Sequence, residues 1–128
     1  MRLWHEKLIP FLPNAQLLGQ HRECAALRGL GWGRKHSTVD YVFTHSPAML
    51  YFYHSLVMHE MTVRGFKVDR KWIEATYRGL RSESWSESEL WKNDIDDCDS
   101  EFIYPEHNEK YLRECLDNLR GKGVTLNI

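Results

Sequence analysis

The sequence has few cysteines and no long apolar segment. The cysteines are Cys24, Cys98 and Cys115, and no C-x-x-C pair occurs among the 128 residues. An odd number at wide spacing argues against a disulfide framework or a structural zinc site and predicts ordinary reduced thiols. No apolar run approaches the roughly 20 residues of a membrane span. Because Glu6 and Lys7 interrupt the first apolar stretch, we expect no signal peptide and a cytoplasmic protein without a membrane partner.

The chain also has little net charge, −1 in total. Residues 1–37 nevertheless hold six basic and two acidic side chains, a local charge of +4, whereas the rest holds eleven basic and sixteen acidic ones, a charge of −5. One basic end on an acidic body is typical of a protein that touches a polyanion with one face. A local excess of this size is also a common fluctuation, so charge alone leaves nucleic-acid binding open.

Motifs for bound phosphate or metal are absent as well. The glycine-rich stretch 29–33 has no G-x-x-x-x-G-K-[ST] pattern, so it is not a nucleotide phosphate loop. His54 and His59 are five residues apart, which is poor for one helix face. His59-Glu60 also lacks the second histidine of H-E-x-x-H, so we expect no metal site.

What the sequence does contain is helical spacing with clear start and stop signals. Asn14, Ser46, Asp69 and Asn108 are placed to cap helices, and glycines follow the apolar repeats. The pattern predicts a mainly α fold, a single compact domain over 1–128 of about four helices with long loops. Helices are expected at 15–28, 47–64, 70–78 and 109–120, with an irregular start at 2–12, a strand signal at 39–43 and one short helix within 80–100.

The amino terminus is a candidate nucleophile. An α-amino group has a reference pKa of about 7.7–8.0, so part of it is neutral at cytoplasmic pH, and amines form Schiff bases with electrophilic carbon. The neighbouring Arg2 is expected to lower that pKa by like-charge repulsion and, being bulky, to keep Met1 from being removed. The alternative is an ordinary, inert terminus.

The first predicted helix carries a polar face and two arginines. Gln16, Gln20 and Glu23 repeat at the i, i+4, i+7 spacing of one face. A carboxylate there could transfer protons or stabilise a cationic sugar. Arg22 could hold a phosphate and Arg28 another. The alternative for Arg22 and Glu23 is a solvated ion pair.

A glycine-rich loop follows and ends in a basic triplet. Its glycines permit close backbone approach to a ligand, and Arg34-Lys35-His36 supplies positive charge beside it. His21 and His36 could contact a phosphate or base. Trp32, like Trp4, Trp85 and Trp91, could stack on bases, although most tryptophans belong to a core. A plain connector is the alternative for this loop.

These motifs, in this order, resemble the pyrimidine-dimer DNA glycosylase family of the phage endonuclease V type, best over residues 1–68. The resemblance is carried by the following segments: Met1-Arg2-Leu3, Leu17-Leu18 to Arg22-Glu23, 29–36 with its Arg-Lys-His end, Ser46-Pro47 and Arg64-Gly65-Phe66. Gln16 stands where the family has a histidine, the arginine after the glutamate is displaced to Arg28, and a lysine-rich C-terminal tail is absent.

The resemblance implies a metal-independent bifunctional glycosylase and AP lyase that acts on damaged double-stranded DNA as a monomer, with no cofactor. The Met1 amine would attack C1′ of the damaged nucleotide, and the imine would permit β-elimination with proton transfers assisted by Glu23. The implied DNA-contacting residues are Arg2, Arg22, Arg28, Arg34, Lys35 and His36, followed by Gln16, His21 and Trp32. The near-neutral charge keeps an alternative open, a non-catalytic nucleic-acid-binding or protein-interaction module with the same fold.

Overall fold

Three substantial helices organise the chain, and all the regular structure described is helical. The computed structural model describes residues 2–31, 40–80, 82–91 and 102–126. The helices are α1 (Asn14–Ala26), α2 (Pro47–Val63) and α4 (Glu109–Gly121). The predicted mainly α class is therefore confirmed. None of the helices within these ranges is long and apolar enough to cross a membrane.

Short elements connect the three helices. They are the 3₁₀ turns η1 (Glu6–Phe11), η3 (Asp40–Thr44) and η4 (Arg70–Ile73), the π turn η2 (Leu27–Gly31) and the one-turn helix α3 (Glu87–Leu90). Ser86 begins α3 with a capping box, in which its hydroxyl accepts from the Glu89 N–H and the Glu89 carboxylate accepts from the Ser86 N–H.

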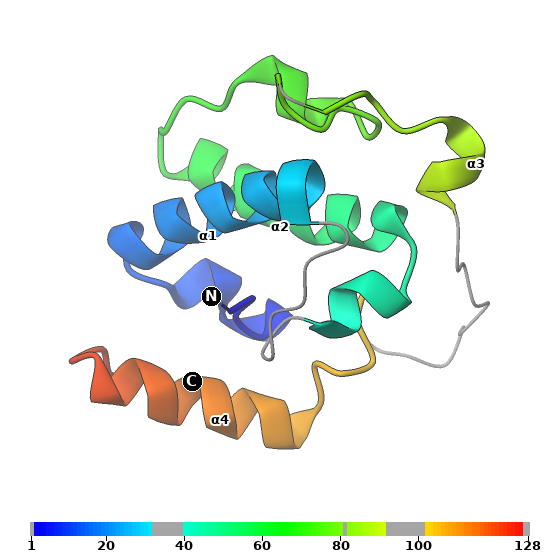
Figure 1. The fold of residues 1–128 in the computed structure, drawn as a ribbon. Coiled ribbons are helices and arrows are strands. Elements are labelled where there is room, and N and C mark those ends of the chain that lie inside the picture. Colours follow the sequence, from blue (N-terminus) through cyan, green and yellow to red (C-terminus); the bar gives the residue numbers. More distant parts are fainter. Residues whose placement is uncertain (1, 32–39, 81, 92–101, 127–128) are drawn as a thin grey trace.

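The elements stack in three layers (Figure 1). Helices α1 and α2 lie side by side in the middle. The N-terminal segment and α4 lie on one side of this pair, and residues 66–91 lie on the other. The N-terminal segment is thus enclosed between α1, α2 and α4, and Leu3, Leu8 and Ile9 belong to the main core.

Each long helix has a local reason to form where it does. Proline occupies the first turn of α2, where its missing N–H costs nothing, and apolar residues on several sides of this helix place it at the centre. In α4, the buried residues Leu112, Cys115 and Leu119 repeat at helical spacing. The Asn108 side chain accepts from the Tyr111 N–H, so the predicted cap is confirmed.

The predicted helix at 70–78 is wrong beyond its first turn. Asp69 does cap this segment, by accepting from the Lys71 N–H, but only η4 forms. The carbonyls of Trp72, Glu74 and Tyr77 instead accept hydrogen bonds from the Arg28 guanidinium. The Glu74 carbonyl also accepts from the Tyr77 N–H at 3.1 Å, so one local turn remains, but all three carbonyls are bound by a distant side chain.

Smaller differences concern the ends of elements. The strand signal at 39–43 is overturned for residues 40–43, because η3 occupies residues 40–44, and residue 39 lies outside the described residues. The start of the chain is more regular than expected, since η1 forms with Pro10 inside it. Helix α1 begins at Asn14 itself, with Pro13 as the preceding residue, and Gly29 lies inside the π turn that follows.

Candidate active site

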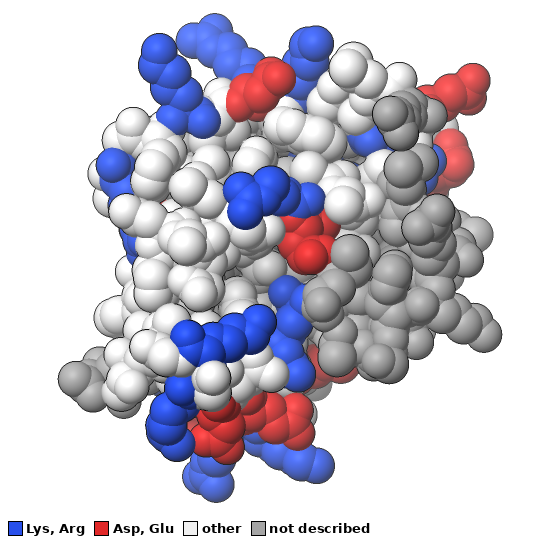
Figure 2. Space-filling view, turned by 60° about the vertical axis from the view of Figure 1, so that its left-hand side comes forward, with Lys and Arg blue, Asp and Glu red and all other residues white. Residues whose placement is uncertain are grey.

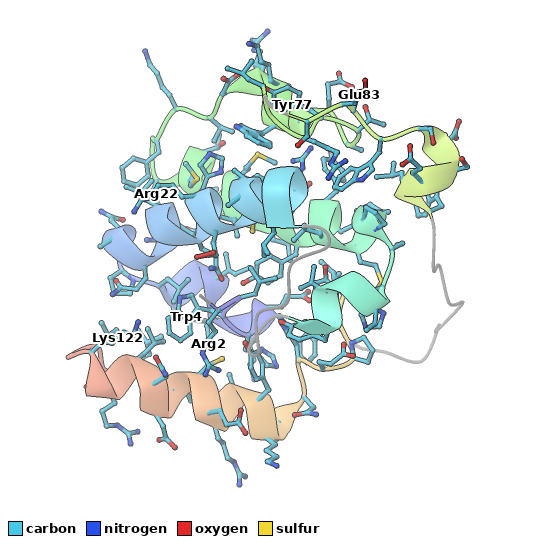
Figure 3. All side chains as sticks on the ribbon, in the orientation of Figure 1. Arg2, Trp4, Arg22, Tyr77, Glu83 and Lys122 are labelled. Carbon is cyan, nitrogen blue, oxygen red and sulfur yellow. The ribbon has the colours of Figure 1, made fainter. Side chains whose placement is uncertain are left out.

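A pocket of about 390 Å³ opens on one side of α1. Its walls come from the N-terminal segment, α1 and the end of α4: Arg2, Trp4, Gln16, Gly19, Gln20, Glu23, Asn118 and Lys122. Figure 3 shows Arg2, Trp4 and Lys122 together between α1 and α4, whereas Tyr77 and Glu83 lie on the opposite side of α1. The pocket therefore collects residues from both ends of the sequence.

Helix geometry explains the α1 wall. Gln16, Gln20 and Glu23 follow one another at intervals of four and three residues, which places them on one face. Gln20 is buried, and Gln16 and Glu23 are half-buried. The Oε2 atom of Glu23 is itself buried. A carboxylate thus lies in the pocket wall, one helical turn from a buried amide.

The backbone of the N-terminal segment is held by side chains from other elements. The Gln20 Nε2 donates to the Arg2 carbonyl at 2.9 Å, and the Trp4 N–H donates to the Gln20 Oε1 at 2.6 Å. The Tyr53 hydroxyl of α2 donates to the Trp4 carbonyl at 2.5 Å. The Tyr111 hydroxyl of α4 donates to the Leu3 carbonyl. Three helices therefore fix residues 2–4 at the pocket.

The next residues are held by a buried histidine. The Glu6 N–H donates to the His107 Nδ1 at 3.1 Å, and the His107 Nε2 lies 2.8 Å from the Tyr41 hydroxyl. Burial, with a smaller contribution from His5, lowers the pKa of His107 to about 3. His107 is therefore neutral at physiological pH. Because its Nδ1 accepts, its Nε2 carries the hydrogen and donates to Tyr41.

Two cations lie in the pocket wall opposite the carboxylate. The Arg2 guanidinium lies 5.6 Å from the Tyr111 ring centroid, and the Lys122 ammonium lies 5.7 Å from the Trp4 ring centroid. Burial lowers the pKa of Arg2, but Tyr111 and Cys115 raise it, and the net pKa lies above its ordinary value. Arg2 therefore stays charged.

Arg22 lies exposed on α1 next to the pocket wall. A Cβ placed on Gly19 would lie 3.7 Å from the Arg22 Nη2, so the guanidinium reaches back along the helix towards a residue that lines the pocket. Figure 3 shows Arg22 extending from α1 at the outside of the molecule. An exposed guanidinium at this place is available to a phosphate.

The structure does not bring Arg28 to the pocket. Its side chain is 0% exposed, and its guanidinium donates to three carbonyls of residues 72–77. Burial lowers the pKa of Arg28 to about 10, so it remains charged at neutral pH. Its place in the interior gives no support to the expected contact with phosphate.

His21 also faces away from the pocket, towards α2. Its Nδ1 lies 2.8 Å from the His54 Nε2, and the Arg28 Nη1 donates to the His54 Nδ1 at 3.1 Å. Burial and the neighbouring arginines lower the pKa of His21. His21, which is half-buried, therefore contacts the buried pair of His54 and Arg28 rather than the pocket.

Several predicted site residues lie outside the described residues: Met1, Trp32, Arg34, Lys35 and His36. Of the other tryptophans considered for stacking, Trp4 and Trp85 are buried, and Trp91 is 44% exposed. Trp4 was expected either to belong to the core or to stack on a base. It is a core residue that also lines the pocket.

Sequence reasoning missed the contribution of α4. Asn118 and Lys122 are four residues apart at the end of that helix and face the pocket. Their spacing is visible in the sequence, but nothing local connects it with residues 16–23. Among the described side chains on the face in Figure 2, basic groups lie around a small acidic area rather than in one continuous basic track.

The described residues contain no group of three or more His, Cys, Asp or Glu side chains placed to hold a metal ion. The ionisable side chains that line the pocket are the carboxylate of Glu23 and the cations of Arg2 and Lys122.

This combination defines a class, a helical domain that presents its extended N-terminal segment at a polar pocket with one carboxylate. The family model for pyrimidine dimer DNA glycosylases matches residues 1–74, more than half of the chain. The chain therefore belongs to the pyrimidine dimer DNA glycosylase family. No curated protein and no solved structure was found to match it. The matched range contains the N-terminal segment, α1 and α2, whereas α4 lies beyond it.

Proposed function

We propose that this protein is a DNA glycosylase with AP lyase activity, acting on pyrimidine dimers or related lesions in duplex DNA. The observation that carries the proposal is the fixed N-terminal segment. The Arg2 carbonyl is bonded to Gln20, on the same face of α1 as Glu23. Residues 3–5 are buried, and side chains of three helices bond to residues 2–4, whereas most chain termini are poorly ordered. This ordering supports a task for the amine that precedes Arg2.

The α-amine of Met1 is the proposed nucleophile. One residue of chain spans at most about 3.6 Å, so the amine cannot be far from the bonded backbone of Arg2. Its ordinary pKa of about 7.7–8.0 leaves a neutral fraction at pH 7. The Arg2 guanidinium increases that fraction, because a neighbouring positive charge disfavours the ammonium form.

In the proposed reaction, the amine nitrogen bonds to C1′ while the glycosidic bond breaks and its electron pair leaves with the base. The amine then loses its proton, and the sugar ring opens to give an imine. Removal of a C2′ proton lets the C3′–O3′ bond break with the electron pair leaving on the phosphate. Glu23 is the proposed group for these proton transfers, and its ionised form stabilises the cationic imine.

The cations are proposed to hold the DNA backbone. Arg2 and Lys122 line the pocket, and Arg22 is exposed beside it. The basic triplet at 34–36 is proposed to add further phosphate contacts, because its side chains carry positive charge next to the glycine-rich loop. Arg28 has no part in this proposal, since its guanidinium is used inside the fold.

Borohydride trapping tests the proposal. Protein with a native N-terminus is mixed with duplexes containing an abasic site or a cyclobutane dimer, and the imine is reduced to a stable adduct. We expect one covalent product per protein, located at Met1 by mass spectrometry. Extending the N-terminus by Gly-Ser abolishes the adduct, and the same extension at the C-terminus serves as the control. Absence of an adduct with native-terminus protein refutes the proposed activity.

A non-catalytic nucleic-acid-binding or protein-interaction module with the same fold is the second candidate, because a net charge of −1 is weak for an enzyme that must hold duplex DNA. In its nucleic-acid-binding form, it predicts salt-dependent duplex binding without any trapped adduct. The trapping and binding measurements made on one preparation separate the two functions.

A further inference from the structure

The Gln20 side chain holds two backbone groups of the N-terminal segment at once. It is 3% exposed, and it bonds to Arg2 through its amino group and to Trp4 through its carbonyl oxygen. The two bonded residues flank Leu3. This is the pattern that a neighbouring β-strand would make with residues 2 and 4, supplied here by one side chain of a helix.

Both ends of the Gln20 amide are needed for this pattern. The Arg2 carbonyl can only accept and the Trp4 N–H can only donate, so the amide orientation is fixed. A glutamate has no hydrogen to give to Arg2, and an asparagine is one carbon shorter. The Tyr53 hydroxyl, shared between the Gln20 Oε1 at 2.6 Å and the Trp4 carbonyl, further restrains the amide.

We infer that Gln20 is a positioning residue that holds the backbone of Arg2, the residue next to the proposed nucleophile, beside the face of α1 that carries Glu23. This inference rests on the proposed function. Gln20 and Glu23 are three residues apart on α1, which is an axial rise of about 4.5 Å on one face. The same helix therefore carries Glu23, the proposed proton-transfer group, and Gln20, whose two bonds to Arg2 and Trp4 form a clamp on the N-terminal segment. Misplacement of a reacting group by about 1 Å can cost about 100-fold in rate.

Substitutions at Gln20 separate the two halves of the clamp. Gln20→Met keeps the length of the side chain and removes both hydrogen bonds. Gln20→Glu keeps the acceptor for Trp4 and loses the donor to Arg2. We expect Gln20→Met to slow single-turnover imine formation by about 10- to 100-fold with unchanged duplex Kd. In Gln20→Glu an ionised carboxylate next to the amine also raises its pKa, so the pH–rate profile moves to higher pH.

Two tyrosines of α2 provide a matched control. The Tyr53 hydroxyl donates to the clamp, whereas the Tyr51 hydroxyl donates to the Ile73 carbonyl at 2.7 Å, on the other side of the α1–α2 layer. Tyr53→Phe is expected to slow imine formation, and Tyr51→Phe is not, although each loses a tyrosine–carbonyl bond. Equal rate losses in the two variants, or a folded Gln20→Met with the wild-type rate and pH profile, overturn the positioning role.

A measurement without DNA keeps this inference distinct from the proposed function. Reductive methylation with ¹³C-formaldehyde places a labelled dimethyl group on the α-amine, whose NMR resonance reports its surroundings. We expect the wild-type resonance to differ from that of the denatured protein, and in Gln20→Met to move towards the denatured value. An unchanged resonance in folded Gln20→Met refutes the clamp. Failure of wild-type trapping with the expected resonances refutes only the lyase activity.

Discussion

Two side chains in and just after helix α1 hold irregular chain segments on opposite sides of the helix, but by different chemical means. Near its middle, Gln20 binds residues 2–4 through a neutral amide. Just past its C-terminal end, Arg28 binds residues 72–77 through a charged guanidinium. Both side chains are buried, and both replace the regular backbone partners that these segments lack. The two segments lie on opposite sides of the helix (Figure 1).

The difference lies in what each group can bind. An amide both donates and accepts, so Gln20 pairs with a carbonyl and an N–H of residues 2–4. A guanidinium only donates, so Arg28 gathers carbonyls and bends the chain around itself. Its charge is further surrounded by the Trp72 and Tyr51 rings, at 5.0 and 5.4 Å from their centroids. Gln20 thus holds residues 2–4 beside α1, whereas residues 72–77 fold around the Arg28 guanidinium.

This comparison changes how the basic character of residues 1–37 is understood. Arg28 counts towards the local charge, yet it is fully buried and serves the fold. The arginines available at the surface near the pocket are Arg2 and Arg22. An arginine that follows a catalytic-type glutamate in sequence therefore has two possible fates, and only the burial of its side chain distinguishes them.

The largest expected effect, on the rate of strand cleavage, comes from Glu23→Gln. This substitution changes the pocket side of α1 and leaves the Arg28 contacts intact. Without a group that exchanges protons, single-turnover strand cleavage is expected to fall by about 10²- to 10⁴-fold, while duplex affinity is retained. Glu83→Gln is the control, because Glu83 lies exposed on the opposite side of α1 (Figure 3). Wild-type cleavage by Glu23→Gln removes this residue from the mechanism.

The next effect, on stability, comes from Arg28→Met, which removes the contacts between the Arg28 guanidinium and residues 72–77 on the opposite side of α1. It removes the side-chain donor of three carbonyls in residues 72–77, of which the Glu74 carbonyl keeps the Tyr77 N–H as a donor. At about 1 kcal/mol for each lost bond, the free energy of unfolding is expected to fall by about 3 kcal/mol. Urea unfolding measures this loss, and Arg22→Met, an exposed site on the same helix, is expected to stay within about 0.5 kcal/mol of wild type.

DNA binding by a folded Arg28→Met protein distinguishes the structural role from the phosphate contact expected from sequence. If Arg28 serves the fold alone, the salt dependence of duplex affinity keeps its slope. A decrease of about one in that slope would restore the phosphate contact and contradict the structural role.

Local signals in the sequence were sufficient for the helices. Pro47 at the start of α2 and the Asn108 cap of α4 act within one turn, so they could be recognised without the fold. The polar face of α1 was visible for the same reason, because its residues are three and four positions apart. The prediction at 70–78 was wrong because its carbonyls bind a side chain 44 to 49 positions earlier.

The candidate pocket was only half visible for a related reason. The contacts that hold the N-terminal segment join residues up to 108 positions apart, as between Leu3 and Tyr111. No periodicity or spacing reports such contacts. The resemblance over the first half of the chain indicated Glu23 and Arg2, and helical spacing placed Gln20 on the same polar face. The fold then added the bonds from Gln20 to residues 2–4 and the pocket residues Asn118 and Lys122 at the end of α4.

Two glycines sharpen the comparison between the two ends of the helix. A Cβ on Gly29 would lie 2.7 Å from the Arg78 carbonyl oxygen, whereas one on Gly19 would meet nothing closer than the flexible Arg22 side chain. Gly29→Ala must therefore displace backbone, and we expect a loss of about 2 kcal/mol in unfolding free energy. Gly19→Ala is expected to gain about 0.8 kcal/mol from helix propensity. Differential scanning calorimetry of both variants measures the difference in stability. Equal effects would show that the backbone of residues 78–79 moves away from the added methyl group at little cost in free energy.

The last comparison is the response to pH, which involves buried histidines on both sides of α1. His107 holds the N-terminal segment and His54 accepts from Arg28, and burial lowers the pKa of each, to about 3 for His107 and well below its ordinary value for His54. An unfolded histidine takes up a proton below about pH 6.5, but these folded ones do not. Their contribution to stability is therefore complete above pH 6.5 and is lost as the pH falls from 6.5 towards 3.

Each such histidine makes unfolding easier by about 1.4 kcal/mol per pH unit below 6.5. The two together predict a slope of about 2.7 kcal/mol per unit between pH 6 and pH 5 in urea unfolding. His107→Gln removes one titrating group and is expected to halve that slope while lowering stability at pH 7. His59→Gln, an exposed residue of α2, is expected to leave it unchanged. If His107→Gln keeps the full slope of unfolding free energy against pH, His107 does not contribute to the acid response. The bond from the Glu6 N–H then does not depend on a neutral imidazole, and the response comes from the His54 side.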